Sequence, residues 1–374
     1  MRFGSKLWLS LLQVLGIVAL ASQCASPATP TAEPQPTAEN RFGLVHYSER
    51  RNSTGVVTGG LYLLDLETKE ERSLTPGGPI SVYAVTLSWS PVTREVVYTE
   101  GASMADMELY RGDLEGRNTR LTDNNVEDSG AKWAPDGSRL AFNSRRSNGT
   151  LRKPYLMKPD GSGVQPILED SLVAVGEFVW SPDSQRLAVT TPIFQPDNSG
   201  PLANELYIIN VDTEETLLHL THNRSRSVLD WSPDGDELVY TSDITMENNY
   251  SVAATIMTLN IETGEEKELA RFEAVAIPQW SPAGNVIAFT GGTPYEMNVY
   301  LIRGDGTDME KLTADGFFSI GSWSPDGKKL ALTSFGEDLA ESELYVLDVE
   351  TKDLEQVTQN DAFDGYPIWV ELDE

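Results

Sequence analysis

The sequence predicts an all-β fold built from a repeated unit of four short antiparallel strands, and three observations support this prediction. A turn that begins with tryptophan recurs along the chain, and its clearest copy is Trp-Ser-Pro-Asp-Gly at residues 231–235. From Trp89 to Trp369 the repeated tryptophans are spaced by 44, 47, 51, 49, 43 and 46 residues. Short segments alternate apolar and polar residues, and long amphipathic helical runs are missing. A period of about 40–50 residues is typical of propellers and solenoids, so we expect a β-propeller.

The repeated turn has a chemistry that fits its shape. Proline sets the backbone for the first corner, aspartate tolerates the second, and glycine adopts a positive φ. We expect the turn aspartates to hold the turn through hydrogen bonds to the backbone, and the tryptophans to pack one unit against the next rather than to stack on sugars. The tryptophans at the repeated position are Trp89, Trp133, Trp180, Trp231, Trp280, Trp323 and Trp369.

Each turn is followed by three more predicted strands. The second strand of each unit is an alternating run such as residues 237–241, the third often contains Leu-Tyr, and the fourth ends on Leu-Thr, as at residues 220–221. Residues 41–374 accommodate seven blades of about 45–48 residues; six and eight blades are the alternatives. The strand at 42–47 lacks a preceding tryptophan turn, and the strand ending at Trp369 lacks a following one. We therefore expect these N- and C-terminal strands to pair and to close the propeller.

The N-terminus resembles a bacterial lipoprotein leader. Residues 1–23 form a charged and then apolar signal peptide, and Cys24, the single cysteine, follows it directly. The resemblance implies lipidation of Cys24, although Gln23 departs from the usual small residue; ordinary cleavage after Ala21 is the alternative. Residues 24–40 are rich in Pro, Thr and Ala and predict an extended linker. The protein is then an extracytoplasmic, membrane-anchored lipoprotein, periplasmic or on the cell surface.

Composition excludes several classes of partner. The chain has 57 Asp and Glu against 28 Lys and Arg, and a formal net charge of −29. Such a surface repels nucleic acid and anionic lipid headgroups, so we expect no nucleic acid partner and membrane contact through the lipid anchor alone. A single cysteine excludes an intrachain disulfide.

The repeated turn, the Leu-Ala-Phe run after it and the later Leu-Tyr and Leu-Thr pairs resemble the TolB-type propeller repeat, a relative of WD-repeat propellers. The resemblance covers essentially all of residues 41–374. Known members include a periplasmic protein that binds a peptidoglycan-associated lipoprotein, and the propeller halves of prolyl oligopeptidase-like enzymes. The resemblance implies a propeller with a tendency to bind proteins. It names no partner, because the small α/β domain of TolB and the hydrolase domain of the peptidases have no counterpart in this sequence.

Motifs for catalysis are missing from the sequence. It contains no Gly-x-Ser-x-Gly, His-Glu-x-x-His, phosphate-binding loop or Cys-x-x-Cys pattern. The three histidines are His46, His219 and His222, and the last two are expected on opposite strand faces. We therefore expect no catalytic residues, no metal and no cofactor. An enzyme remains the competing class: a carbohydrate- or peptide-active propeller, or a binder of a glycan or small ligand, would use the central channel.

Candidate binding residues lie on the loops between the second and third strands of each unit. These loops vary in length and share one face with the connections between blades, and binding residues are common on loops held by a rigid scaffold. We predict a non-catalytic, monomeric cell-envelope scaffold that binds a protein or peptide, with a glycan as an alternative, through this loop face. Alanine at its four basic positions should weaken binding without lowering the melting temperature. The candidates are Arg145, Arg146, Arg152, Lys153, Phe194, Tyr250, Tyr295 and Phe335.

Overall fold

The computed structural model describes residues 41–51, 57–75, 86–101, 103, 106–146, 152–167, 176–194, 201–220, 226–247, 250–293, 295–314, 316–336 and 342–373. The chain divides into two compact units, Met1–Glu39 and Asn40–Glu374, and all described residues belong to the second. The predicted signal peptide, Cys24 and linker lie outside the described residues. The described residues form strands and turns, and they include no helix that is long and apolar enough to cross a membrane.

The strands are short and follow one another through tight turns and loops. In chain order they are β1 (Arg41–Arg51), β2 (Val57–Asp65), β3 (Glu71–Ser73), β4 (Ser88–Ser90), β5 (Glu95–Glu100), β6 (Glu108–Asp113), β7 (Asn118–Arg120), β8 (Asp128–Trp133), β9 (Leu140–Ser144), β10 (Lys153–Met157), β11 (Gln165–Pro166), β12 (Phe178–Trp180), β13 (Arg186–Phe194), β14 (Pro201–Asn210), β15 (Thr216–Leu220), β16 (Arg226–Trp231), β17 (Glu237–Glu247), β18 (Tyr250–Asn260), β19 (Glu266–Phe272), β20 (Ala274–Trp280), β21 (Val286–Thr293), β22 (Glu296–Arg303), β23 (Glu310–Lys311), β24 (Phe318–Trp323), β25 (Lys329–Phe335), β26 (Ser342–Asp348), β27 (Leu354–Gln356) and β28 (Phe363–Leu372).

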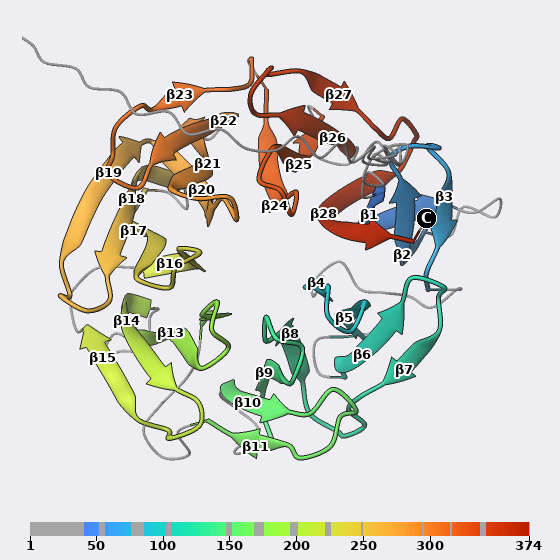
Figure 1. The fold of residues 1–374 in the computed structure, drawn as a ribbon, viewed down its shortest axis with the longest axis horizontal. Helices are drawn as coiled ribbons and strands as arrows, with labels where there is room; N and C mark the ends of the chain where they lie inside the picture. Colours follow the sequence, from blue (N-terminus) through green and yellow to red (C-terminus); the bar gives the residue numbers. More distant parts are fainter. Residues whose placement is uncertain are drawn as a thin grey trace, which may run out of the picture. The chain divides into compact units, whose positions relative to one another are not determined.

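These strands form antiparallel sheets that surround a common axis (Figure 1). Five sheets have four strands each: β4–β7, β8–β11, β12–β15, β16–β19 and β20–β23. The remaining eight strands form one sheet, in which the group β24–β27 joins the group β28, β1, β2 and β3 through one parallel pair, Ser342 with Phe363. The predicted all-β architecture of four-stranded antiparallel units is confirmed.

The first and last strands lie side by side. β1 pairs antiparallel with β28, from Arg41 opposite Leu372 to Glu49 opposite Phe363. On its other edge β1 pairs with β2. The first and last described strands therefore belong to the same sheet.

The Trp-Ser-Pro-Asp-Gly turn has the predicted hydrogen bonds. The Gly235 N–H donates to the Ser232 carbonyl at 2.9 Å, and the Asp236 N–H donates to the Asp234 carboxylate at 3.1 Å. The Ser232 hydroxyl donates to the same carboxylate at 2.6 Å and accepts the Glu237 N–H at 2.9 Å. Gly235 has a φ of +76°, which disfavours a side chain at this corner. The turn aspartate thus has a structural role.

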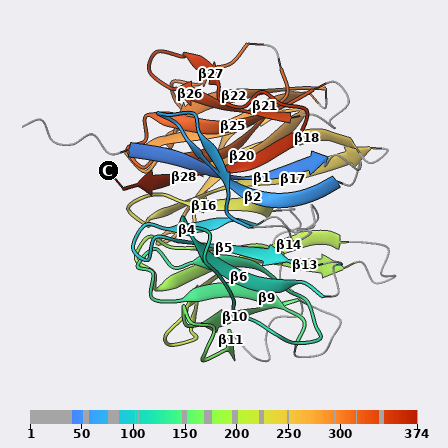
Figure 2. The ribbon, with the colours of Figure 1, turned by 90° about the vertical axis from the view of Figure 1, so that its right-hand side faces the viewer.

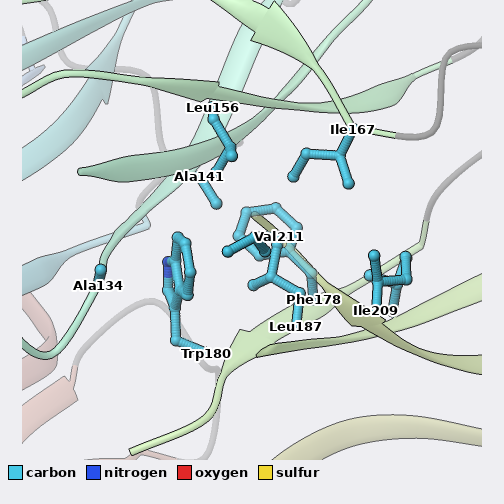
Figure 3. Close-up of a cluster of buried hydrophobic side chains, with 10 residues drawn as sticks. Ala134, Ala141, Leu156, Ile167, Phe178, Trp180, Leu187, Ile209 and Val211 are labelled. Carbon is cyan, nitrogen blue, oxygen red and sulfur yellow. The ribbon is translucent and has the colours of Figure 1, made fainter. Parts of the chain in front are cut away.

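The repeated tryptophans pack between neighbouring sheets, as the sequence predicts. Trp180 of β12 lies in a cluster with Ala141 and Leu156 from the preceding sheet and Leu187 from its own (Figure 3). All the repeated tryptophans except the half-buried Trp89 are buried. Burial of one large apolar side chain contributes about 1.5–3 kcal/mol, so these tryptophans help to hold neighbouring sheets together.

The second strand of a sheet ends, and its third strand begins, at one side of the unit. In the side view, the hairpins β13–β14 and β17–β18 extend toward the same side (Figure 2). We call this side the loop face. The turns after the tryptophans are at the opposite ends of the strands, because consecutive strands are antiparallel.

Candidate functional site

A ring of side chains lies next to the axis, one position before each repeated tryptophan. Successive residues of a strand point to opposite faces, so these side chains point away from their own tryptophan and toward the next sheet. The ring consists of Ser88, Lys132, Val179, Asp230, Gln279, Ser322 and Ile368. In Figure 1 the strands that carry it, such as β8, β16, β20, β24 and β28, are those nearest the axis.

Most polar members of the ring bond to the following sheet. The Ser88 hydroxyl accepts the Trp133 N–H at 3.1 Å, and the Ser322 hydroxyl accepts the Trp369 N–H at 3.0 Å. Asp230 performs the same task with a carboxylate, which accepts the Trp280 N–H at 2.7 Å. The ring therefore links neighbouring sheets at the axis.

Backbone carbonyl groups of ring residues also accept hydrogen bonds from the next sheet. The indole Nε1 of Trp180 donates to the Lys132 carbonyl at 3.2 Å, and that of Trp231 donates to the Val179 carbonyl at 3.2 Å. Trp323 makes the equivalent bond to the Gln279 carbonyl at 3.3 Å. In each bond, the indole of one sheet donates to a ring residue of the sheet before it in the chain.

Two adjoining cavities of about 290 Å³ each open at the ring. The axial cavity lies between inner strands and is lined by Thr86, Leu87, Lys132, Ile277, Ser319, Ile320, Gly321, Thr333, Phe335, Phe363, Gly365, Tyr366, Pro367 and Ile368. The second, which we call the side cavity, is lined by Thr86, Met107, Glu127, Ser129, Gly130, Lys132, Asn143, Arg152, Gly176, Glu177 and Phe178. Both cavities share Thr86 and Lys132, so Lys132 stands between them.

Burial perturbs the charged groups beside these cavities. It lowers the pKa of Lys132, although Glu177 and Asp230 act in the opposite direction. It raises the pKa of Asp230 to about 7, against the stabilising effect of the Trp280 and Trp231 backbone N–H groups and of Lys132. Shifted values of this kind are common at functional sites.

The predicted basic cluster lies at the loop-face end of β9 and β10, where buried carboxylates hold its arginines. Arg145 Nε and Arg152 Nη2 lie 2.8 and 2.5 Å from the two oxygens of Glu127, whose side chain is only 3% exposed. Arg146 Nη2 lies 2.6 Å from the fully buried Asp128. The Arg146 guanidinium also lies over the rings of Phe142 and Tyr155. The residues 147–151 between them lie outside the described part.

These ion pairs correct one expectation. The sequence predicts that alanine at the four basic positions leaves the melting temperature unchanged. In the structure such a variant would leave Glu127 and Asp128 buried without their partners, which costs several kcal/mol. We therefore expect the quadruple alanine variant to lower the melting temperature.

The other predicted binding residues are dispersed. Phe335 lines the axial cavity and packs edge-on against Phe317, with ring centroids 5.7 Å apart. Tyr295 is 85% exposed. Lys153 begins β10 and is half-buried. The backbones of Phe194 and Tyr250 belong to β13 and β18, but their side chains lie outside the described residues.

The sequence reasoning missed Lys132 and Asp230. Their signal was present, because both occupy the same column of the repeat. In that column the other members are Ser, Val, Gln, Ser and Ile. A lysine and an aspartate at an inner-strand position that is otherwise small, amide or aliphatic indicate a charged axis.

A separate cluster surrounds His46 in β1. The imidazole is fully buried, and its Nε2 lies 2.8 Å from Glu71 Oε1. Arg50 pairs with the other oxygen of Glu71. Glu71 and Arg50 line an open groove of about 970 Å³ together with residues 357–362.

His219 is partly exposed and stacks on Tyr207 at 4.1 Å between ring centroids. His222 lies outside the described residues, and no group of described His, Cys, Asp or Glu residues is arranged to hold a metal ion.

Sheets around an axis, joined by tryptophans and lined by an inner ring, define a TolB-like β-propeller fold. Two known structures are similar to most of the chain. A putative TolB from Agrobacterium tumefaciens superposes with a TM-score of 0.53 at 18% identity, covering 80% of this chain and 99% of its own. A puromycin-hydrolysing peptidase of Mycobacterium tuberculosis superposes with a TM-score of 0.62 at 13% identity, covering 86% of this chain and 52% of its own.

Sequence comparison gives the same picture. An uncharacterised protein of Agrobacterium fabrum is 26% identical over 55% of this chain and 66% of its own length. A TolB homologue of Chlorobaculum tepidum is 29% identical over 34% of this chain and 27% of its own length. An uncharacterised peptidase of Bacillus subtilis is 26% identical over 53% of this chain and 28% of its own length. Residues 232–321 also match the N-terminal region of dipeptidyl peptidase IV. The sequence matches to these three relatives thus span two thirds or less of each relative's own length.

Proposed function

We propose that this protein is a non-catalytic binding scaffold of the cell envelope, a seven-bladed propeller anchored through a lipid on Cys24. Seven is the count when the eight-stranded sheet is divided into its two groups of four, and pairing of β1 with β28 then closes the ring. The similarity to a TolB homologue favours an extracytoplasmic location and a protein or peptide partner. The protein acts as a monomer, and the partner binds at the loop face.

The observation that carries this proposal is the fixed array of arginines at the loop-face end of β9 and β10. Three arginines, Arg145, Arg146 and Arg152, pair there with two buried carboxylates, Glu127 and Asp128, and Lys153 lies beside them in the sequence. The side chains of the three arginines are 26–40% exposed, so they are both held and accessible. Side chains that are already fixed lose less entropy when a partner binds. In an acidic protein this array is an attractive surface for an acidic partner.

A capture experiment tests the proposal. The full-length protein in detergent is immobilised beside the variant Arg145→Met, Arg152→Met, Glu127→Gln, which removes one charged group together with its partners. Such a balanced replacement avoids leaving a buried carboxylate unpaired. We expect envelope extract to yield a protein that the wild type retains and the variant loses, in a salt-sensitive manner.

The control removes an exposed ion pair elsewhere. Arg117 and Glu115 lie in the turn between β6 and β7, with Nη2 and Oε2 2.8 Å apart. Arg117→Met with Glu115→Gln should retain the partner. Equal retention by the loop-face variant would overturn the proposed binding surface.

Peptide cleavage is the second candidate function. It is favoured by the match of residues 232–321 to the N-terminal region of dipeptidyl peptidase IV and by the similarity to peptidases. Turnover of a fluorogenic peptide by the purified protein would support this candidate. The turnover should persist when inhibitors of contaminating peptidases are added. We favour the scaffold, because the matched residues 232–321 lie in the propeller sheets. Binding propellers, as well as peptidases, contain such sheets.

A further inference from the structure

Lys132 is the exception in the ring at the axis. Ser88, Asp230 and Ser322 accept a tryptophan N–H of the next sheet, and Gln279 donates to the Gly321 carbonyl at 3.1 Å. Lys132 is equally polar, yet among the described residues its Nζ makes no hydrogen bond or ion pair. Its contact is with the face of Phe178, whose ring centroid lies 5.7 Å away. The ammonium group is therefore held at the cavities without a counter-ion in contact.

The side cavity next to Lys132 exists because of one glycine. Three residues before three of the repeated tryptophans, the backbone is left-handed: φ is +68° at Gly130, +51° at Ile277 and +56° at Tyr366. Ile277 and Tyr366 fill their positions with side chains that line the axial cavity. Gly130 has none, and a Cβ placed there would meet only the Asn143 Nδ2, at 3.8 Å. The missing side chain leaves the space into which Lys132 opens.

A second polar atom in the side cavity also lacks a partner. Asn143 is 8% exposed, and its Oδ1 is buried without a hydrogen bond from any described residue. A buried acceptor without a donor is costly unless a ligand or water supplies one. The cavity thus offers a donor that lacks an acceptor, Lys132 Nζ, and an acceptor that lacks a donor, Asn143 Oδ1.

We propose that the side cavity binds a peptide carboxylate, with Lys132 as its counter-ion and Asn143 Oδ1 accepting a neighbouring N–H of the same ligand. The carboxylate is either a chain terminus or an acidic side chain. This inference rests on the proposed binding function, since Arg152 and Glu127 belong both to the arginine array and to the cavity wall. It assigns the chemistry of the group that the partner inserts.

The carboxylates around the cavity oppose a doubly charged anion more strongly than a singly charged one. The charged groups around the cavity are Lys132, Arg152, Glu127, Glu177 and Asp230. Glu127 is neutralised by Arg145 and Arg152. Glu177 and Asp230 would repel a dianion such as phosphate more strongly than a carboxylate, and Lys132 would repel a cation.

The experiment uses the full-length protein in detergent and three probes. N-acetylglycine carries a terminal carboxylate, N-acetylglutamic acid α-amide carries a side-chain carboxylate, and N-acetylglycinamide is neutral. Binding is followed by saturation-transfer NMR of the probe and by titration. We expect one or both carboxylates to bind and the amide not to bind, and their relative affinity distinguishes a chain terminus from an acidic side chain.

Two variants locate the site. Lys132→Met keeps the aliphatic chain and removes the charge, and we expect it to weaken carboxylate binding by about tenfold or more. Gly130→Tyr fills the cavity with the residue found at the equivalent position 366 and leaves every charge in place, so we expect it to abolish binding. The control Lys328→Met removes an exposed lysine in a turn and should bind as the wild type does. Thermal unfolding confirms that each variant is folded.

The outcomes separate this inference from the proposed function. Equal binding by wild type and Lys132→Met, no binding of either carboxylate, or tighter binding of inorganic phosphate would each overturn the carboxylate site. None of these results would affect the capture of a partner by the arginine array. Carboxylate binding that depends on Lys132, combined with failure of the capture experiment, would keep the site and reject the protein scaffold.

Discussion

His46 Nε2 lies 2.8 Å from Glu71 Oε1 at a position that several other sheets fill with a buried aromatic ring. His46 is opposite Tyr62 in β2, just as Phe142 is opposite Tyr155 and Phe289 is opposite Tyr300. Glu71 thus compensates for a polar side chain in an apolar position. The sheet that contains both ends of the described chain differs from the others in having this pair at its centre.

Replacing Glu71 with Gln should destabilise the protein by about 1–3 kcal/mol, because buried His46 and Arg50 lose the carboxylate that they share. Urea unfolding monitored by tryptophan fluorescence measures this change. Glu70→Gln, at the exposed neighbouring residue, is the control and should have little effect. Adding His46→Phe to the Glu71→Gln variant should recover part of the loss, and a further loss would contradict the apolar character of the site.

The pH dependence of stability should also change in the Glu71→Gln variant. Bonds from His46 and Arg50 lower the pKa of Glu71, although burial alone would raise it. A lowered pKa in the folded state contributes stability above the unfolded value of about 4.3, and this stability is lost as the pH falls through the folded value. We expect a flatter stability profile below about pH 4.5 for the variant than for the wild type. Identical acid profiles would contradict the pairing.

Asp230→Asn should stabilise the protein at alkaline pH. The pKa of Asp230 in the folded protein, about 7, lies above its ordinary value of 3.8, so the folded chain retains a proton that the unfolded chain releases. Stability from this group is present at low pH and is lost as the pH rises through 7. Asparagine still accepts the Trp280 N–H, so we expect a gain of about 1–2 kcal/mol at about pH 8 and little change at about pH 5. Asp236→Asn, at an exposed position, should show no such step.

Two tryptophans should respond differently to replacement by phenylalanine. The Nε1 of Trp231 donates to the Val179 carbonyl, whereas the buried Nε1 of Trp133 has no partner among the described residues. Trp231→Phe removes a hydrogen bond and leaves a carbonyl unsatisfied, but Trp133→Phe removes an unpaired donor. We expect Trp133→Phe to cost about 1–2 kcal/mol less in the free energy of unfolding. Equal costs would show that these indole bonds contribute nothing.

Cys24→Ser tests the predicted lipid anchor. If Cys24 is lipidated, labelling of cells with a fatty acid probe should mark the wild type and not the variant, and the variant should leave the membrane fraction. A single acyl chain anchors only weakly, whereas two or more hold a protein stably. Cleavage after Ala21 without lipidation would give an unlabelled protein in both cases.

Much of the fold could be predicted from the sequence, because its rules are local. The Trp231 turn specifies its own hydrogen bonds, and its recurrence predicts a series of four-stranded sheets. Five sheets have this form, and the remaining eight strands belong to one sheet. Alternating residues such as those of 237–241 define strands without knowledge of the partner strand. The pairing of β1 with β28 followed from two incomplete repeats at opposite ends of the chain.

The site could be predicted less well, because it depends on contacts between repeats. Arg145, Arg146 and Arg152 were identified as a cationic group, but the buried Glu127 and Asp128 that hold them precede β9 and are not marked by any motif. The column of the repeat marks Lys132 as a charged exception, but its lack of a hydrogen-bond partner among the described residues of the next sheet appears only in the structure. Such an absence is a property of the assembled sheets and is not visible in one repeat.

The position of β1 between β28 and β2 has a mechanical consequence. A force that enters the domain at Arg41 and acts along the strand would load two antiparallel ladders at once, the one from Arg41 to Glu49 and the one from Gly43 to Arg51. The hydrogen bonds of both ladders would then share the load in shear, rather than break one after another from an exposed edge. Tension between this end of the strand and a partner on the loop face would therefore act on a strand that is held along both of its edges.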